Sequence, residues 1–523
     1  MNLLLFLLSI ITVSAVGIHS VRCADSQNKT KLIIIGAGPS GLAAATKLIT
    51  DGVDEFIILE AENRIGGRVY NLPYEGDTFI DMGAQWVHGQ EGNPVYQMAK
   101  EHQLVKEECP TFSGVLCFNS SREPVDKELA SKLLKTMFDV VESQDENSVR
   151  DMSNYNGSLG DFVLERVRTQ LNNNASLSHL LSSPRFEELV EYFGKYENSV
   201  DGSDSWFQTS AKGLAQYESL KGCNNVEWKK GGYGNVFKLL MKQLPGQTQI
   251  DLSNKILLNK EVTKINWTDP NVVLVECADG TSYTGDKVLI TVSLGVLKTK
   301  PDLFVPQLPS WKTNAIENVF FGTLDKIFLR FPHKWWPAGV GEFTGLNFVW
   351  TKHDEETLFK EVGGVDDRPW VIDITGFYTN TEDPLTLLGW ISGPSARYME
   401  TLTDTQVGID TMKLLRHFFS NSSIPEPTRV VKSTWNSNPH FKGSYSSRSL
   451  KTERANTSQS ELAKPVINTR GDRVALMFAG EATNPTHYGT VHGAVETGWR
   501  EADRIVNLRI RDALVAIGSP AAI

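Results

Sequence analysis

Apolar and polar positions near the start of the chain predict a strand, a helix and a second strand. A run that begins at Lys31 is almost wholly aliphatic and ends at Gly36. Residues 42–49 are rich in Ala and Leu, and Phe56 to Leu59 are again continuously apolar. A strand, a helix and a strand in close succession are typical of a parallel α/β sheet with a crossover helix.

Three glycines, Gly36, Gly38 and Gly41, separate the first predicted strand from the helix. In this spacing they permit a tight turn, close approach of the backbone to a pyrophosphate, and close packing of the helix on the strand. The start of the helix offers free N–H groups and a partial positive charge to the phosphates. Glu60 ends the second strand, where a ribose-binding carboxylate belongs. The segment therefore predicts a dinucleotide site.

The next residues favour FAD over NAD as the dinucleotide. Arg64 and Arg68 enclose Ile65, Gly66 and Gly67, which bring two more glycines and a guanidinium to the same phosphates. An NAD-binding domain needs no such second cradle.

A second segment, about 400 residues later, matches the flavin end of the same cofactor. Val474 to Phe478 predict a strand, and Gly480 and Glu481 follow it. A carboxylate at that strand end can accept hydrogen bonds from a ribityl chain. Thr490 and Val491 begin a predicted amphipathic helix to about residue 508, whose amino terminus would stabilise negative charge on a reduced flavin. The alternative is an ordinary strand, loop and helix, with Thr490 only as the helix cap.

The middle of the chain divides into strands and two flanking regions. Residues 255–297 alternate apolar and polar positions with breaks at Asp269-Pro270 and Asp279-Gly280, which predicts a β-meander. Its last strand, 287–293, would re-enter the nucleotide-binding domain. The predicted fold is α/β (α+β overall), a Rossmann-like FAD-binding domain with an interleaved substrate-binding domain. The FAD-binding domain is assigned to 25–93, 228–310 and 465–510, and the substrate-binding domain to 94–227 and 311–464.

The amino-acid composition and the first 24 residues indicate the class of the protein and its cellular location. The chain has 523 residues, 40% hydrophobic and 22% charged, which argues against disorder and against a multi-span membrane protein. A net charge of −10 argues against nucleic acid as a main partner. The apolar run from Leu3 to Ile18 predicts a signal peptide over residues 1–24, cleaved after Ala15 or near Cys23. The alternative is a retained anchor, although the run is short for a full span and no Lys or Arg precedes it.

Glycosylation sequons, together with the signal-like start, indicate a secreted or secretory-pathway glycoprotein. The five cysteines have no metal-binding spacing, and Cys109 and Cys117 are close enough in sequence for a local bridge. Seven N-x-S/T sequons occur, at Asn28, Asn119, Asn156, Asn174, Asn266, Asn421 and Asn456.

Six motifs together resemble the flavin-containing amine oxidases, and within them the polyamine oxidases, which include the spermine and acetylpolyamine oxidases of animals. They cover most of the chain from Lys31 to Ile505. The motifs are GAGPSGLAAA, EAENRIGGR, DMGAQWVHG, KVLITVSLGVLK, DKIFLRF and FAGEATNPTHYGTVHGAVETGWREADRI.

The resemblance implies which residues contact the cofactor. In monoamine oxidases a cysteine bonds covalently to the flavin; this chain has Ser444 there, so the resemblance implies non-covalent FAD. Besides the glycines Gly36, Gly38, Gly41 and Gly67, the implied contacts are Ser40, Glu60, Arg68, Gln85, Trp86, Val262, Glu481, Thr490 and Val491.

The resemblance also implies the residues that act on the substrate. Lys326 matches a lysine that holds a water at flavin N5, and burial would lower its pKa. By itself a lysine in an apolar strand is more often an edge or snorkelling residue. His88 matches a histidine that faces the substrate, whereas a lone histidine is usually a satisfied polar group. Tyr445, Thr490 and Trp435 match the pocket, with core packing as the alternative for the two aromatic residues.

The implied activity is oxidation of the C–N bond at a secondary amine of spermine, spermidine or their N1-acetyl forms. Hydride passes to flavin N5, and O2 reoxidises the flavin to give H2O2, an aminoaldehyde and a shorter amine. The stretch from Asp201 to Gln216, where these enzymes set substrate charge, aligns poorly.

Three other functions compete with polyamine oxidation. A secreted L-amino-acid oxidase would need a cationic clamp for the substrate carboxylate. A histone lysine demethylase would need a nuclear address and chromatin-binding modules. A flavin-binding protein without turnover is the third possibility.

Overall fold

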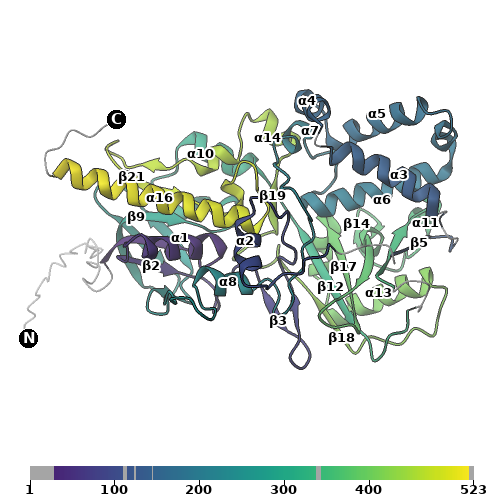
Figure 1. Cartoon of the computed structure of the whole chain (residues 1–523), viewed down its shortest axis with the longest axis horizontal. Coiled ribbons are helices and arrows are strands. Elements are labelled where there is room, and N and C mark those ends of the chain that lie inside the picture. Colours follow the sequence, from purple (N-terminus) through teal and green to yellow (C-terminus); the bar gives the residue numbers. More distant parts are fainter. Residues whose placement is uncertain are drawn as a thin grey trace, which may run out of the picture.

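The computed structural model describes residues 29–109, 115–122, 125, 127–143, 145–336 and 343–516. Residues 1–24, for which a signal peptide is predicted, lie outside this part of the chain. Two large sheets stand at opposite ends of an elongated molecule (Figure 1). Among the described helices none is both long and apolar enough to cross a membrane.

The first sheet has nine strands and contains both predicted halves of the cofactor site. Its main order is β10-β7-β8-β9-β1-β2-β6, and β21 pairs with both β9 and β20. The strands are β1 (Lys29–Ile35), β2 (Phe56–Leu59), β6 (Ile256–Leu257), β7 (Val262–Asn266), β8 (Val273–Cys277), β9 (Ser282–Ile290), β10 (Phe304–Val305), β20 (Val466–Ile467) and β21 (Val474–Phe478).

A parallel core within this sheet brings the two ends of the chain together. β6, β2, β1, β9 and β21 are parallel neighbours, so the strand at 474–478 lies two places from β1. Helix α1 (Pro39–Thr50) and the long helix α16 (Val491–Ala516) pack against each other over this sheet (Figure 1). The predicted strand–helix–strand unit and the predicted strand and helix near the end of the chain are confirmed.

The predicted meander is confirmed in β7, β8 and β9, which are successive antiparallel neighbours. The second half of β9 then runs parallel to β1, as expected for a strand that re-enters the nucleotide-binding domain. Two details were wrong. β6 pairs with β2 rather than with the meander, and α9 (Leu294–Thr299) is a helix because the Ser293 hydroxyl accepts a hydrogen bond from Val296 N.

The second sheet has six strands in the order β18-β12-β17-β16-β13-β5. All pairs are antiparallel except β13–β5. It packs on helices α12 (Gly393–Glu400) and α13 (Asp404–Phe418) in one aromatic-rich core. The strands are β5 (Val115–Asn119), β12 (Leu324–Arg330), β13 (Gly345–Val349), β16 (Gly376–Thr379), β17 (Thr386–Ser392) and β18 (Arg429–Lys432).

A helical lobe stands beside the second sheet and has its own core (Figure 1). It consists of α3 (Lys127–Val141), α4 (Glu146–Asn154), α5 (Leu159–Asn172), α6 (Pro184–Asp201) and α7 (Ala211–Leu214).

The remaining described α-helices and strands are short. They are α2 (Pro94–Glu101), α8 (Asn235–Leu240), α10 (Ser310–Asn318), α11 (Lys352–Thr357), α14 (Leu450–Arg454), α15 (Gln459–Ala463) and the strand pairs β3 (Asn71–Pro73) with β4 (Phe79–Asp81), β11 (Phe320–Gly322) with β19 (Tyr445–Ser447), and β14 (Gly364–Val365) with β15 (Arg368–Pro369).

The apolar core of the first sheet extends past the ranges predicted for the FAD-binding domain. Val95 and Ala99 of α2 pack on one face of the sheet, and Ala315 of α10 and Leu462 of α15 pack on the other. The strands of each sheet nevertheless fall within the ranges assigned to one predicted domain. The domain boundaries themselves stay a prediction.

One disulfide joins Cys109 to Cys223, 114 residues apart. The local pairing considered from sequence, Cys109 with Cys117, is therefore wrong. Cys117 lies in β5 of the second sheet and is a free thiol. The chain beside Cys109 instead runs along residues 226–229, where Val105 and Trp228 form an antiparallel bridge.

Candidate active site

A cavity of about 1370 Å³ connects the glycine-rich turn after β1 with the interior between the second sheet and the helical lobe. Residues of both predicted cofactor segments border it. Of the residues predicted for the site, Gly41 alone is not among those that line the cavity: Gly36, Gly38, Ser40, Glu60, Gly67, Arg68, Gln85, Trp86, His88, Val262, Lys326, Trp435, Tyr445, Glu481, Thr490 and Val491 all border it.

The first three glycines form a cradle that side chains would fill. Gly36 has φ +107°, and a Cβ there would lie 2.5 Å from Thr291 Oγ1. A Cβ on Gly41 would lie 2.1 Å from Gly36 O, so Gly41 allows α1 to pack against the turn. A Cβ on Gly38 would meet no atom closer than Gly66 O at 4.0 Å, and Gly38 borders the cavity at the start of α1. The cradle fits a pyrophosphate that approaches the backbone at Gly38.

Glu60 lies buried at the end of β2, beside this cradle. Its carboxylate accepts hydrogen bonds from Ala37 N at 2.7 Å and Glu62 N at 2.9 Å. Burial raises the pKa of Glu60, and these two backbone donors oppose the rise. A carboxylate held in this way on the cavity wall suits a ribose hydroxyl, which donates hydrogen bonds to it.

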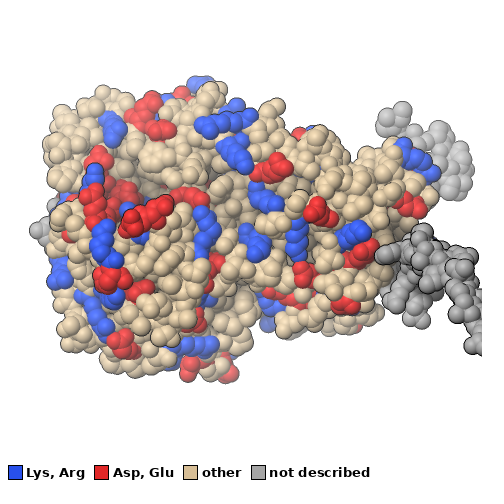
Figure 2. Space-filling model, turned by 180° about the vertical axis from the view of Figure 1, so that it is seen from behind, with Lys and Arg blue, Asp and Glu red and all other residues tan. Residues whose placement is uncertain are grey.

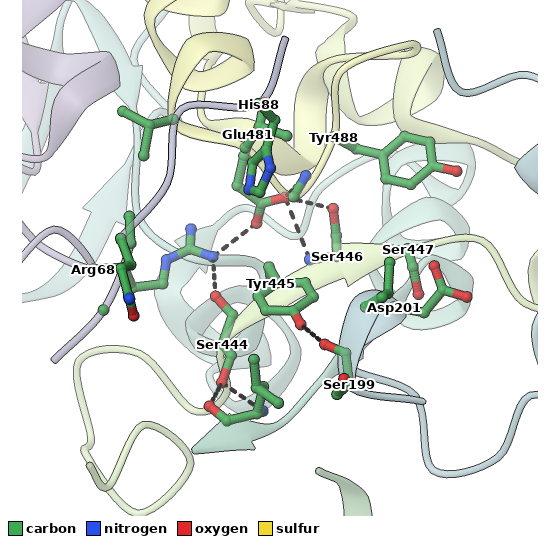
Figure 3. A pocket seen from close by; sticks show the side chains of 18 of the residues that line it. Arg68, His88, Ser199, Asp201, Ser444, Tyr445, Ser446, Ser447, Glu481 and Tyr488 are labelled. Atoms are coloured by element: carbon green, nitrogen blue, oxygen red, sulfur yellow. Dashed lines mark hydrogen bonds and ion pairs between the residues drawn. The ribbon is translucent and has the colours of Figure 1, made fainter. Parts of the chain in front are cut away.

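The second glycine pair packs against the first cradle. The Arg68 side chain extends away from the predicted phosphate position. A Cβ on Gly67 would lie 3.6 Å from Gly38 Cα. Arg64 pairs with Glu62 at 2.7 Å. Arg68 Nη1 donates to Ser444 O at 2.7 Å and to Glu481 Oε1 at 2.8 Å (Figure 3). The structure therefore places the Arg68 guanidinium beside the second cofactor segment.

Glu481 is the buried centre of a hydrogen-bond network (Figure 3). Besides Arg68, its carboxylate accepts from Ser446 Oγ at 2.6 Å and Gly489 N at 2.8 Å. Both oxygens thus have protein donors. Glu481 joins the first glycine-rich segment, β19 and the loop before α16, and it borders the cavity at the same time.

Thr490 caps a helix and also lines the cavity, so it combines the two roles considered from sequence. Its hydroxyl accepts from Gly493 N at 3.0 Å, which caps α16, and it donates to His487 O at 2.8 Å. Thr490, Val491 and His492 also line the cavity, so the amino terminus of α16 faces the site. A helix terminus in this position stabilises negative charge on a ligand.

Lys326 is buried in the middle of β12 and is not an edge or snorkelling residue. Its Nζ donates to Asp81 O at 2.7 Å, Gly83 O at 2.8 Å and Gln85 Oε1 at 2.8 Å. Burial lowers its pKa, while the Asp81 carboxylate and three acceptors favour the ammonium. All three N–H donors have protein acceptors. A water bound by Lys326 would have to replace one of them, and Gln85 is the only one that is a side chain.

His88 borders the cavity with a defined tautomer. The ring is enclosed by protein, yet its surface is open to the cavity. Its Nδ1 lies 2.6 Å from Asn224 O, which can only accept, so Nδ1 carries the proton and Nε2 is left as an acceptor. Burial lowers the pKa of His88, which favours this neutral form.

The two predicted pocket aromatics are held by hydrogen bonds as well as by packing. Trp435 packs edge-on against Phe441 with ring centroids 5.3 Å apart, and its indole donates to Met82 O at 3.3 Å. Tyr445 donates to Ser199 O at 2.5 Å (Figure 3). Both rings line the cavity, so core packing and pocket lining are combined.

Sequence reasoning missed the carboxylates at the lobe end of the cavity. Glu197 and Asp201 of α6 are buried and border it, and the exposed Glu142 borders it too. Burial raises the pKa of Glu197 well above its usual range and that of Asp201 to about 6. Asp201 Oδ2 has no hydrogen-bond partner among the described residues. On the back of the molecule, acidic side chains also gather around a hollow at this end (Figure 2).

Aromatic side chains form the wall between these carboxylates and the cofactor cradle. The Trp390 ring lies 5.4 Å from that of Trp86 and 5.1 Å from that of Tyr378, measured between centroids. Tyr488 and Tyr217 form a further pair at 5.2 Å. All five rings line the cavity. The site therefore runs from a nucleotide cradle, through an aromatic passage, to buried acid groups.

Comparisons with known proteins agree with this arrangement. The family profile "Flavin containing amine oxidoreductase" matches residues 39–506. A bovine (Bos taurus) "Peroxisomal N(1)-acetyl-spermine/spermidine oxidase" is 28% identical over 515 residues, which cover 91% of this chain and 95% of the relative. "Probable polyamine oxidase 5" of Arabidopsis thaliana is 29% identical over 550 residues, covering 91% and 98%.

The fold also matches solved structures. A wild-type putrescine oxidase bound to putrescine superposes with a TM-score of 0.66 at 19% identity, over 92% of this chain and 99% of the other. At that identity the likeness shows the fold alone, an α/β amine-oxidase fold.

Proposed function

The chain belongs to the family of flavin-containing amine oxidoreductases, and from this membership we propose that it oxidises polyamines at a secondary amine. Its cofactor is FAD, for which the cradle at Gly36 and Gly38, the Glu60 carboxylate and the terminus of α16 provide a fitting site. The products would be an aminoaldehyde, a shorter amine and H2O2. The names of the curated relatives, which specify acetylated and free polyamines, support this substrate class.

The observation that carries the proposal is the acidic end of the cavity. No described Lys or Arg supplies a countercharge to the buried Glu197 and Asp201, and burial raises the pKa of both carboxyls because it removes water from the charged form. An ammonium group would supply that charge. A polyamine is a chain of such groups, so one end would bind these acids while an inner amine lies near the cofactor.

When bound, FAD accepts a hydride from the carbon beside the amine and passes the electrons to O2. The protein holds the amine for this reaction. With Nδ1 fixed by Asn224, His88 presents Nε2 as an acceptor, which would orient an N–H of the substrate. The lowered pKa of His88 keeps it from adding a positive charge beside a cationic substrate.

Lys326 would act through the groups that it holds. Its ammonium fixes Gln85 and the carbonyls of Asp81 and Gly83 around the cavity. If Gln85 turns away, the freed N–H would hold one water for hydrolysis of the oxidised amine. The Trp86, Trp390 and Tyr378 rings would exclude other water from the passage.

The described cavity wall does not favour the amino-acid oxidase alternative. That function requires a cation to bind the substrate carboxylate, and every Lys or Arg on the described wall already has a partner. Arg68 binds Glu481, Lys260 binds Asp279, Lys300 binds Glu261, and Lys326 binds three carbonyl-type oxygens.

We also propose that the protein matures in the secretory pathway. Disulfides persist mainly in oxidising compartments, and Cys109 pairs with Cys223. The asparagines of the sequons differ in solvent exposure. Asn28 lies outside the described residues, Asn119 is buried at 1% exposure and Asn266 is half-buried. The remaining four are exposed, at Asn156, Asn174, Asn421 and Asn456.

Release of H2O2 from the purified holoprotein tests the proposal. Spermine, spermidine, their N1-acetyl forms and a panel of L-amino acids are compared at equal concentration. Oxidation of one or more polyamines, with an aminoaldehyde among the products, is expected. Turnover of amino acids alone would replace the proposal with the amino-acid oxidase function.

A further inference from the structure

The Cys109–Cys223 disulfide lies next to the residue that orients His88. We infer that this disulfide is a positioning element of the active site, which holds the Asn224 carbonyl against His88. The inference rests on the proposed function in one respect, namely that His88 orients the substrate amine.

The segment that carries His88 is one side of a short antiparallel ladder. Val87 and Val226 exchange two backbone hydrogen bonds, at 3.0 and 3.1 Å. Gly89 N donates to Cys223 O at 3.0 Å. The bond from His88 Nδ1 to Asn224 O, 2.6 Å, lies between these rungs. Cys223 is therefore itself part of the ladder, one residue from the carbonyl that fixes the His88 tautomer.

The segment that leads to Cys109, residues 104–106, forms a second ladder with the same strand-like segment. Lys106 N donates to Glu227 O and Lys229 N donates to Leu104 O, both at 2.8 Å. Residues 226–229 thus lie between the His88 segment and residues 104–106. The disulfide closes this three-segment arrangement at the end where Asn224 lies.

The disulfide also joins the two ends of the chain segment that forms the helical lobe. Cys109 and Cys223 are 114 residues apart, and the chain between them includes α3 to α7 of the helical lobe, which carries Glu197 and Asp201. The chain leaves for the lobe at Cys109 and returns at Cys223. Both ends of this excursion therefore lie beside the His88 segment.

Without the cross-link, residues 221–226 would keep the backbone hydrogen bonds of the ladder, the bond from Cys223 N to Gln90 Oε1 and the packing of buried Val226. Cys109 and Asn224 are exposed and Cys223 is half-buried against the core, so apolar packing holds the segment at Val226 but not at Asn224. Movement of Asn224 would free His88 Nδ1 and permit the other tautomer, with Nε2 protonated and unable to accept. The titratable group that faces His88 from the neighbouring element is His492 of α16, whose pKa burial lowers to about 3. His492 stays neutral, so the protonation and the tautomer of His88 depend on the substrate and on Asn224.

A double-mutant cycle tests the inference. The pair C109S/C223S is made in the native and the H88Q background, and C277S, a buried free cysteine that is not among the residues lining the cavity, is the control. In the native background we expect KM for spermine to rise about tenfold with kcat within twofold, and the pH profile of kcat/KM to shift. In the H88Q background the same change should alter KM less than twofold, because His88 is no longer there to be misplaced.

An equal rise of KM in both backgrounds would overturn the inference, since the disulfide would then act independently of His88. An unchanged KM in the native background would overturn it too. If the double variant does not fold, mild reduction of the native disulfide, with thiols counted by mass spectrometry, replaces it. The NMR signal of the His88 ring, assigned with H88Q, gives a readout without substrate. The His88 ring should change tautomer on reduction even if the protein oxidises no polyamine. This readout therefore separates the inference from the proposed function.

Discussion

Arg68 and Glu481, 413 residues apart in the chain, form an ion pair of 2.8 Å on the wall of the cofactor cavity. The same guanidinium nitrogen binds Ser444 O, and the same carboxylate binds Ser446 and Gly489. The pair thus joins the segment 64–68, which follows β2, to the loop between β21 and α16. Neither segment is complete as a cofactor site without the other.

Removal of the Glu481 charge should loosen this junction. E481Q keeps the size of the side chain but leaves Arg68 without a countercharge in a largely buried place. We expect the flavin-loaded protein to lose about 2 kcal/mol of stability and to bind FAD at least tenfold more weakly. Thermal unfolding and fluorescence titration of the apoprotein with FAD measure both effects. D139N removes an exposed ion pair with Lys135 and should change neither; equal effects of the two variants would contradict the role of Glu481.

Lys326 should matter for chemistry more than for flavin binding. K326M removes the donor shared by Asp81 O, Gly83 O and Gln85 Oε1. We expect the rate of flavin reduction by substrate or of its reoxidation by O2 to fall about 10- to 100-fold, while the flavin remains bound. Stopped-flow absorbance separates the two half-reactions. K132M, at an exposed site on α3, is the control. If neither rate changes in K326M, the assigned role of Lys326 is wrong.

Binding of polyamine should depend on the ionisation of Asp201. Burial raises the pKa of its carboxyl to about 6, above the value of about 3.9 usual for Asp in unfolded chains. Between these values the folded protein holds the extra proton, so the ligand-free protein loses stability as pH rises from about 4 to about 6. A bound cation favours the ionised form, so KM for spermine should fall as pH rises through about 6.

D201N tests this relationship because its side chain cannot ionise. The variant should have a higher KM for spermine near neutral pH and a KM that no longer changes around pH 6. D151N, at an exposed position on α4, should keep the native profile. Thermal unfolding across the same pH range measures the stability effect. A native pH profile in D201N would exclude Asp201 as a cation-binding group.

The flavin should be released on denaturation. Ser444 stands where monoamine oxidases have a flavin-bonding cysteine, and its hydroxyl is hydrogen-bonded to Leu324 O and N, each at 2.8 Å. Acid precipitation of the holoprotein should leave all flavin absorbance in the supernatant. Yellow colour retained in the protein pellet would indicate a covalent bond.

Glycans, if the protein enters the secretory pathway, should occupy the exposed sequons. Changes of Asn156, Asn174, Asn421 or Asn456 to Gln should each reduce the shift in mass that a glycosidase produces. N119Q should leave the glycan mass unchanged, because Asn119 is buried at the end of β5. Glycan mass lost in N119Q, or no glycan on the protein from a secretory host, would contradict this expectation.

Local sequence patterns were sufficient to predict the two cofactor-binding segments. The turn at Gly36, the strand to Glu60 and the strand before Glu481 are each determined by residues close together in sequence, and their bounds were predicted within a few residues. His88, Lys326 and Trp435 could be named only through the resemblance. Their roles depend on neighbours such as Asn224 and Gln85, which tertiary structure brings to them.

The acid end and the disulfide could not be predicted for a physical reason. Glu197 and Asp201 share a face of α6, but the same helix also carries acidic residues on its exposed face, such as Glu187 and Glu191. Sequence alone does not show which face points inward. Likewise Cys117 is nearer to Cys109 in sequence, and the fold of the whole lobe is needed to bring Cys223 to it.

Anaerobic titration of the purified holoprotein with spermine, followed by visible absorbance, tests the central claim most directly. A cavity that joins a flavin cradle to buried acids predicts loss of the oxidised flavin bands on addition of about one equivalent of spermine. The bands should return when O2 is admitted, with release of H2O2. Flavin bands that persist with every polyamine and bleach only with amino acids would contradict the claim, as would a purified protein that binds no flavin.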